Sequence, residues 1–188
     1  MVLVILHRVN TIEGLVSSDS EFGIECDIRD GLVVTHDTGT SGESFQQFSK
    51  FLAGKPLVIL NIKSEGIETD VARHLPAGVD YFFLDSSFPM ILKTSPKAAI
   101  RFSEYERMDT VRAMKGLSEW VWVDTFKGFH FKKSEALEMK SLGFKICIVS
   151  PELQKKDIRV VHDYVRYLSG FPIDAVCTKF PQVWKDFR

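Results

Sequence analysis

The sequence predicts an α/β protein, a compact (β/α)8 barrel (TIM barrel) of parallel strands with a β-hairpin after the second strand. Strand-like and helix-like patterns alternate from one end of the chain to the other, which is typical of a parallel sheet. The strand-like runs are almost continuously apolar, as expected for strands buried on both faces. Polar residues follow the carboxyl ends of these runs, where barrels carry their chemistry. An open, doubly wound sheet is the alternative arrangement of the same elements.

Eight runs rich in Val, Ile, Leu and Phe are the expected strands. They are short, and Gly, Pro or polar residues bound them, so each reads as one strand of a repeated unit. In order they cover residues 2–6, 24–28, 56–63, 81–84, 98–103, 120–123, 145–149 and 175–177.

Segments with apolar residues at helical spacing separate most of these strands. Glycine or proline follows several of them, and both residues are common where helices stop. A helix or loop is expected at residues 11–20, and helices are expected at 41–52, 67–75, 89–93, 108–117, 133–142 and 156–168.

The second strand is expected to open a β-hairpin over residues 22–36, because Asp30-Gly31 joins two apolar runs and glycine accepts the positive φ of a tight turn. Side chains alternate along a strand, so Glu25 and Asp27 share one face and apolar residues the other. The two carboxylates then lie about 7 Å apart along the strand. Such a pair can bind one hard divalent cation, and the returning arm brings His36 towards it.

Size and composition fit one globular domain, residues 1–188, with 45% hydrophobic and 26% charged residues. The net charge of −1 argues against bulk nucleic-acid binding, which needs a basic surface. Cys26, Cys147 and Cys177 lack metal-type spacing and are expected to be reduced, buried packing residues of a cytoplasmic protein. The apolar start of the chain is too short to span a bilayer, so no integral membrane segment is expected.

Polar side chains follow the carboxyl end of each expected strand. A barrel gathers these ends at one face, so they form a candidate reaction centre. In strand order they are His7 and Arg8; Glu25 and Asp27; Asn61 and Lys63; Asp85; Arg101 and Glu104; Asp124; Glu152; and Lys179.

The motifs His7-Arg8, Asn10-Thr11, Glu25-x-Asp27 and Val33-Val-Thr-His36-Asp37 resemble the signature of the glycerophosphodiester phosphodiesterase family. These are phospholipase-C-like phosphodiesterase barrels of lipid metabolism, and this chain resembles a short, divergent member. The resemblance is specific over about the first forty residues and loose beyond them. The acidic pair and two histidines are also similar to the venom sphingomyelinase D enzymes, which share that barrel.

The resemblance implies a role for each matching residue in hydrolysis of a small phosphodiester. His7 and His36 would be the general acid/base pair, and Arg8 and Lys63 would hold the phosphate. Glu25, Asp27 and Asn61 would bind Mg²⁺ or Ca²⁺. Near the same strand ends, Arg101, Asp124, Glu152 and Lys179 are further candidates for substrate contact.

Several positions depart from the family pattern. Val9 replaces a glycine, Lys179 replaces an acid, and Asn61 stands where the family has a third acidic ligand, for which Asp85 or Glu104 could compensate. Two alternatives therefore stay open: a non-catalytic barrel that binds a phosphorylated ligand, and a lyase that stops at a cyclic phosphate. The oligomeric state is not predicted.

The remaining histidines and the tryptophans of the sixth strand have plain structural interpretations. His74, His130 and His162 are expected on the surface, in helices or loops. Trp120 and Trp122 are expected to pack in the core or at its rim.

Overall fold

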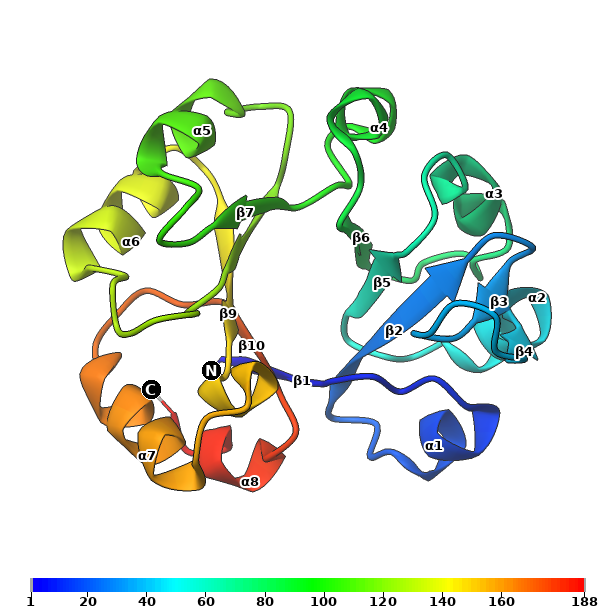
Figure 1. Cartoon of the computed structure of the whole chain (residues 1–188), viewed down its shortest axis with the longest axis horizontal. Helices are drawn as coiled ribbons and strands as arrows, with labels where there is room; N and C mark the ends of the chain where they lie inside the picture. The colour runs from blue at the N-terminus through cyan, green and yellow to red at the C-terminus, as the bar shows by residue number, and fades with distance from the viewer. Residues whose placement is uncertain (1, 188) are drawn as a thin grey trace. The chain divides into compact units, whose positions relative to one another are not determined.

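The structure is a computed structural model that describes residues 2–187. Within these residues it contains ten strands and eight α-helices (Figure 1). The chain divides into two compact units, each described by itself below. The N-terminal unit is Leu6–Ala98, and the C-terminal unit comprises residues 2–5 and 99–187. The expectation of one domain over residues 1–188 stays a prediction.

The N-terminal unit is built on a parallel sheet. Strand β2 (Gly23–Arg29) pairs with β5 (Val58–Ile62), which pairs in turn with β6 (Tyr81–Leu84). Two short strands extend this sheet beyond β2: β3 (Val33–Val34) runs antiparallel to β2, and β4 (Glu43–Ser44) runs antiparallel to β3. The helices of this unit are α1 (Ile12–Ser17), α2 (Phe45–Phe48), α3 (Glu68–Arg73) and α4 (Phe88–Thr94).

The predicted hairpin is present. Its last ladder pair is Arg29 with Val33, so the connection is three residues long. Gly31 and Leu32 take φ values of 74° and 53°, which confirms that the turn needs left-handed backbone where glycine was expected. Gly42 also has a steric reason, because a Cβ there would lie 2.4 Å from the carbonyl oxygen of Val34. The hairpin therefore returns the chain from the end of β2 with little freedom.

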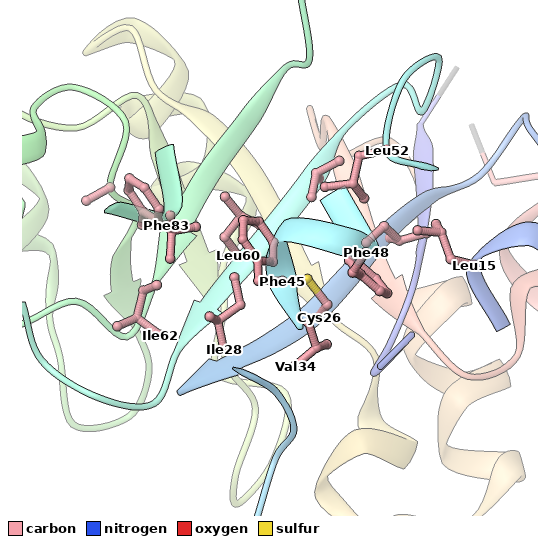
Figure 2. Close-up of a cluster of buried hydrophobic side chains, with 14 residues drawn as sticks. Leu15, Cys26, Ile28, Val34, Phe45, Phe48, Leu52, Leu60, Ile62 and Phe83 are labelled. Atoms are coloured by element: carbon pink, nitrogen blue, oxygen red, sulfur yellow. The ribbon is translucent and has the colours of Figure 1, made fainter. Parts of the chain in front are cut away.

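The apolar face of β2 packs against α2. Phe45 and Phe48 of α2 lie over Cys26 of β2 and Leu60 of β5, and all four side chains are buried (Figure 2). Burying a Phe side chain contributes about 1.5–3 kcal/mol. This core fixes which face of β2 is left for its acidic residues.

The C-terminal unit holds a second run of parallel strands. In sheet order these are β7 (Ile100–Phe102), β8 (Trp120–Val123), β9 (Lys145–Val149) and β10 (Ala175–Thr178). The amide of Leu3, in β1 (Leu3–Leu6), donates to the carbonyl of Asp174 just before β10. The helices are α5 (Met108–Ala113), α6 (Lys133–Ser141), α7 (Ile158–Tyr167) and α8 (Pro181–Trp184), of which α5, α6 and α7 lie on one side of β9 in Figure 1.

Aromatic side chains fill the interior of this unit. Tyr164 of α7 and Trp184 of α8 are fully buried and meet edge to face, with ring centroids 6.4 Å apart. Trp120 and Trp122 are buried, which confirms the packing role predicted for them. All three cysteines are free and buried, as predicted.

The eight predicted strands are all present within a few residues of their expected bounds. The predicted helix at 41–52 is wrong at its start, because residues 43–44 form β4 against the hairpin. The α-helix covers only Phe45–Phe48 and continues as a 3-10 helix, Ser49–Phe51. A 3-10 helix at Pro151–Gln154 and α8 were not predicted, since short turns carry too few residues for a periodic pattern. Within residues 2–187, no helix is long and apolar enough to cross a bilayer.

Candidate active site

The acidic face of β2 is the centre of the site. Glu25 and Asp27 both lie on the face of β2 opposite Cys26, and both are completely buried. In the parallel register with β5, Asp27 lies beside Asn61. Two buried carboxylates on adjacent same-face positions are costly unless something compensates their charge.

Neutral donors compensate Glu25 in part. One carboxylate oxygen accepts a bond from the Arg8 backbone amide at 2.7 Å, and the other accepts from the Asn61 side-chain amide at 2.8 Å. His7 Nε2 lies 3.8 Å from the same carboxylate. Burial and the neighbouring charge of Asp27 nevertheless raise the pKa of Glu25 to about 7, against the lowering effect of those two bonds. Burial and the charge of Asp27 thus outweigh both these bonds and the charge of Lys63.

Asp27 is clamped by Asn10. The Asn10 amide donates to Asp27 Oδ2 at 2.8 Å, and the Asp27 backbone amide donates to Asn10 Oδ1 at 2.9 Å. Lys63 Nζ lies 3.6 Å from Asp27 Oδ1, and Arg8 Nε lies 3.9 Å from Oδ2. These two cations stand near the carboxylate at ion-pair distance without a hydrogen bond to it.

His36 faces Arg8. Arg8 Nη2 lies 2.5 Å from His36 Nε2, and because a guanidinium only donates, Nε2 must accept. His36 Nδ1 then carries the proton and donates to Asp37 Oδ1 at 2.7 Å. The Arg29 side chain holds the His36 carbonyl with two bonds, at 3.0 and 2.7 Å. The imidazole is thus held in one orientation between Arg8 and Asp37.

Two residues at the strand ends adopt left-handed backbone. Arg8 has φ of 57° and Asp85 has φ of 63°. This conformation costs a non-glycine residue about 1–2 kcal/mol. At Arg8 it aims the backbone amide at Glu25, and the Asp85 carboxylate lies 3.1 Å from Lys63 Nζ. Strained residues of this kind cluster at functional sites.

Oxygen atoms left over in this network fit a divalent cation. Asp27 Oδ1 and Asn61 Oδ1 are buried and accept no hydrogen bond in the described structure. Both are hard ligands of the kind that Mg²⁺ and Ca²⁺ prefer, and a dication would offset the charge of the carboxylate pair. Among residues 2–187, no group of three or more His, Cys, Asp or Glu side chains is arranged to hold a metal ion. The donor set that fits is two carboxylates and one amide.

Four predicted substrate contacts belong to the C-terminal unit. Arg101 donates to Asp124, and Gln154 donates to the other oxygen of Asp124 at 3.0 Å. Each of these groups is engaged at the ends of its own strands. Arg101 and Asp124 therefore form an ion pair between neighbouring strands β7 and β8.

Glu152 is also engaged by hydrogen bonds within its own unit. Its carboxylate accepts from the hydroxyls of Ser150 and Thr178 and from the backbone amide of Lys179, the last at 2.8 Å. It thereby joins the end of β9 to the end of β10. The Lys179 side chain is exposed.

The other candidates also have local partners. Glu104 accepts bonds from backbone amides of the loop after β8, whereas Asp85 contacts Lys63 as described above. His130 lies in a loop, as predicted, and is half-buried, with its ring stacked on buried Phe102 at a centroid distance of 5.5 Å. His162 is exposed, as predicted.

A cavity of about 690 Å³ lies in the C-terminal unit between α5 and α6. Of the candidate residues, only Glu104 lines it. Arg112 on its wall is held by Glu138 at 2.6 Å and by Asp109 at 2.7 Å. These three charged residues of the wall therefore pair with one another.

The sequence interpretation assigned no role to three residues that the structure places in the network: Asn10, Arg29 and Asp37. The position of Asn10 just after His7-Arg8, and of Asp37 just after His36, was the available signal. Nothing in the sequence pointed to Arg29, since its contact with the His36 carbonyl depends on the hairpin geometry.

No family model matches the chain, and no curated protein matches it either. A solved structure, glycerophosphodiester phosphodiesterase from Thermotoga maritima, is similar in fold. The TM-score is 0.67 at 18% sequence identity, covering 100% of this chain and 99% of that one. This likeness confirms the predicted fold class, a (β/α)8 barrel, and supports the family resemblance at the level of fold.

Proposed function

We propose that the protein is a phosphodiesterase of the glycerophosphodiester phosphodiesterase type, acting with a divalent cation on a glycerophosphodiester or similar small phosphodiester. One observation carries the proposal. The five residues that match the family motifs, although spread over residues 7–36, form one contact network around the buried acids: His7, Arg8, Glu25, Asp27 and His36. The likeness to a solved enzyme of that name supports it.

Glu25, Asp27 and Asn61 would hold the cation, either Mg²⁺ or Ca²⁺. Bound there, it would neutralise charge on a non-bridging phosphate oxygen. The buried oxygens without hydrogen bonds, Asp27 Oδ1 and Asn61 Oδ1, support this assignment.

Arg8 and Lys63 would bind the phosphate. Arg8 is exposed and reaches both Asp27 and His36, and Lys63 stands between Asp27 and Asp85. An anionic phosphate would draw the guanidinium away from His36, because a charged acceptor is stronger than an imidazole. Substrate binding would in this way free His36 Nε2.

His36 would act as the base and His7 as the acid. His36 Nε2 is the accepting nitrogen, so it can take the proton of the attacking substrate hydroxyl. His7 Nε2 lies 3.8 Å from the Glu25 carboxylate, and His7 would give a proton to the leaving alcohol. The hydroxyl oxygen bonds to phosphorus as the bond to the leaving alcohol breaks, and water then opens the cyclic phosphate with the roles reversed.

Arg101, Asp124, Glu152 and Lys179 remain predicted substrate contacts. The partners described above give each of them a structural use as well, apart from the exposed Lys179 side chain. The free, buried cysteines support a cytoplasmic location, since disulfides are rare there.

The test is metal-dependent release of a phosphomonoester from a panel of small diesters. His7→Ala and His36→Ala should each abolish turnover, whereas His162→Ala, which removes an exposed imidazole from α7, is the matched control. Chelation of divalent ions should silence the wild type. Wild-type turnover in either site variant would end the proposed acid/base assignment.

Asn61 favours a second candidate, a barrel that binds a phosphorylated ligand without cleaving it. The Asn61 amide supplies no charge, and its Nδ2 group already donates a hydrogen bond to Glu25. Saturable phosphate-ester binding with no turnover, with or without added cation, would support this alternative. A cyclic phosphate as the final product would instead identify a lyase.

A further inference from the structure

Exposed aromatic side chains follow three strands of the C-terminal unit. Tyr105 comes shortly after β7, Phe126 after β8 and Phe180 after β10, and their exposed fractions are 64%, 36% and 42%. Strands β7 to β10 are parallel neighbours, so their carboxyl ends lie at one edge of the sheet. Exposed rings repeated at one edge, rather than scattered singly, are typical of a contact surface.

Two of these rings are held firmly in place. Tyr105 and Phe126 contact each other with centroids 6.1 Å apart, and Lys127 Nζ lies 4.9 Å from the Tyr105 ring centroid. The Glu104 carboxylate accepts bonds from the backbone amides of residues 126, 127 and 128, at 3.3, 2.8 and 3.2 Å. The exposed rings therefore stand on an anchored loop, which lowers the entropy lost on docking.

The exposed side chains at this edge that have no ion-pair partner are positively charged. Arg107, Lys127 and Lys179 are exposed, and among the described residues none has a carboxylate at ion-pair distance. The nearby acids have partners of their own. Glu104 accepts from loop amides as above, Glu106 accepts from the Ser103 hydroxyl, and Glu152 accepts from the Lys179 amide at 2.8 Å. Asp109, at the start of α5, pairs with Arg112 at 2.7 Å. Rings and unpaired cations are what remains for a partner.

We propose that this aromatic edge, defined as Tyr105, Phe126, Lys127 and Phe180 with Arg107 and Lys179 beside them, docks onto an anionic lipid surface. Aromatic rings partition to the membrane–water interface, and exposed Lys and Arg attract anionic headgroups. Positive charge beside apolar rings matches that surface on both counts. The inference goes beyond the proposed function, because it concerns where the protein binds and not which bond it cleaves.

The experiment is co-sedimentation of the full chain with vesicles of equal parts phosphatidylcholine and phosphatidylglycerol, and with vesicles of phosphatidylcholine alone. The wild type should bind the mixed vesicles more tightly. Tyr105→Ser with Phe126→Ser should weaken that binding by about tenfold, and Lys127→Gln by about fivefold. Added salt should weaken binding further, because it screens the cations.

Leu137→Ser is the matched control, since Leu137 is 54% exposed but lies within α6, away from the strand ends. It should bind as the wild type does. Phe126→Trp gives a second measurement, a blue shift of tryptophan emission when mixed vesicles are added. Failure of the wild type to sediment with mixed vesicles would overturn the proposal, as would undiminished binding by the double serine variant. Binding that is lost in Lys127→Gln but kept by the double serine variant would likewise count against it, since charge without the rings would then suffice.

Discussion

The two units use the polar side chains at their strand ends in opposite ways. In the C-terminal unit, Asp124 is matched by Arg101 and Gln154, and Glu152 joins two strand ends through hydroxyls and an amide. In the N-terminal unit, Glu25 and Asp27 of β2 are as deeply buried as Asp124, yet Asp27 Oδ1 and Asn61 Oδ1 accept no hydrogen bond. Asp124 and Asp27 thus have the same burial, but only the hydrogen bonds of Asp124 are complete at both oxygens.

The difference separates groups that hold a fold together from groups kept for a ligand. A buried pair with complementary partners stabilises its surroundings and has nothing left to offer. Two like charges side by side, as at Glu25 and Asp27, destabilise the cation-free protein, and a bound cation would offset them. Lys63 and Arg8 reach only Asp27, at 3.6 and 3.9 Å and without a hydrogen bond. The left-handed backbone at Arg8 and Asp85 adds strain in the same N-terminal unit.

The largest expected effect is on catalysis. Asp27→Asn should lower kcat/KM for a glycerophosphodiester by about a thousandfold, because it removes a cation ligand and a carboxylate near Arg8 and Lys63. Without added metal, its thermal midpoint should not fall, since the repulsion of Glu25 is relieved. Steady-state kinetics and thermal unfolding measure the two effects. Asp19→Asn, an exposed control outside the network, should change neither.

The next effect is on stability, in the other unit. Asp124→Ala should lower the free energy of unfolding by about 2–3 kcal/mol, because Arg101 and Gln154 lose their shared acceptor. The partial exposure of Arg101 keeps the loss below that of a fully buried pair. Urea denaturation measures it. A stability equal to the wild type's would remove the contrast between the units.

Much of this contrast could be anticipated from the sequence. The apolar alternation of residues 24–28 and the Asp30-Gly31 turn were enough to predict β2, its hairpin and an acidic face. The sequence could not show which oxygens lack a hydrogen bond. Asn10 contacts Asp27 because of the fold, and Asn61 lies beside Asp27 because of the register between β2 and β5. Likewise, Arg101 and Asp124 were correct as strand-end residues, but their pairing depends on side-chain reach.

A smaller effect sharpens the comparison at the cation site. Asn61→Asp should tighten Mg²⁺ or Ca²⁺ binding by about tenfold, because a carboxylate adds the charge that an amide lacks. The same change should destabilise the metal-free protein near neutral pH, since Glu25 loses the Asn61 donor and gains a second negative neighbour beside Asp27. Isothermal titration calorimetry measures the affinity. Gln47→Glu makes the same charge change at an exposed residue of α2 and serves as the control. Unchanged affinity in both variants would place Asn61 outside the site.

The smallest effect concerns Glu104, an acid of the C-terminal unit that is fully engaged. Burial alone would raise the pKa of Glu104, but the amides of Lys127, Gly128 and Phe126 outweigh it, so the pKa lies below its ordinary value of 4.5. A lowered pKa in the folded state means that the stabilisation is present above pH 4.5 and is lost as the pH falls through the folded-state pKa.

Glu104→Gln should therefore lower the free energy of unfolding by about 1 kcal/mol near neutral pH. The difference from the wild type should shrink as both proteins are taken below pH 4.5, where the unfolded-state carboxyl is protonated. Urea denaturation across this range measures it, with Glu13→Gln on exposed α1 as the control. A difference that persisted undiminished in acid would mean that the Glu104 anchor depends on shape and not on its charge.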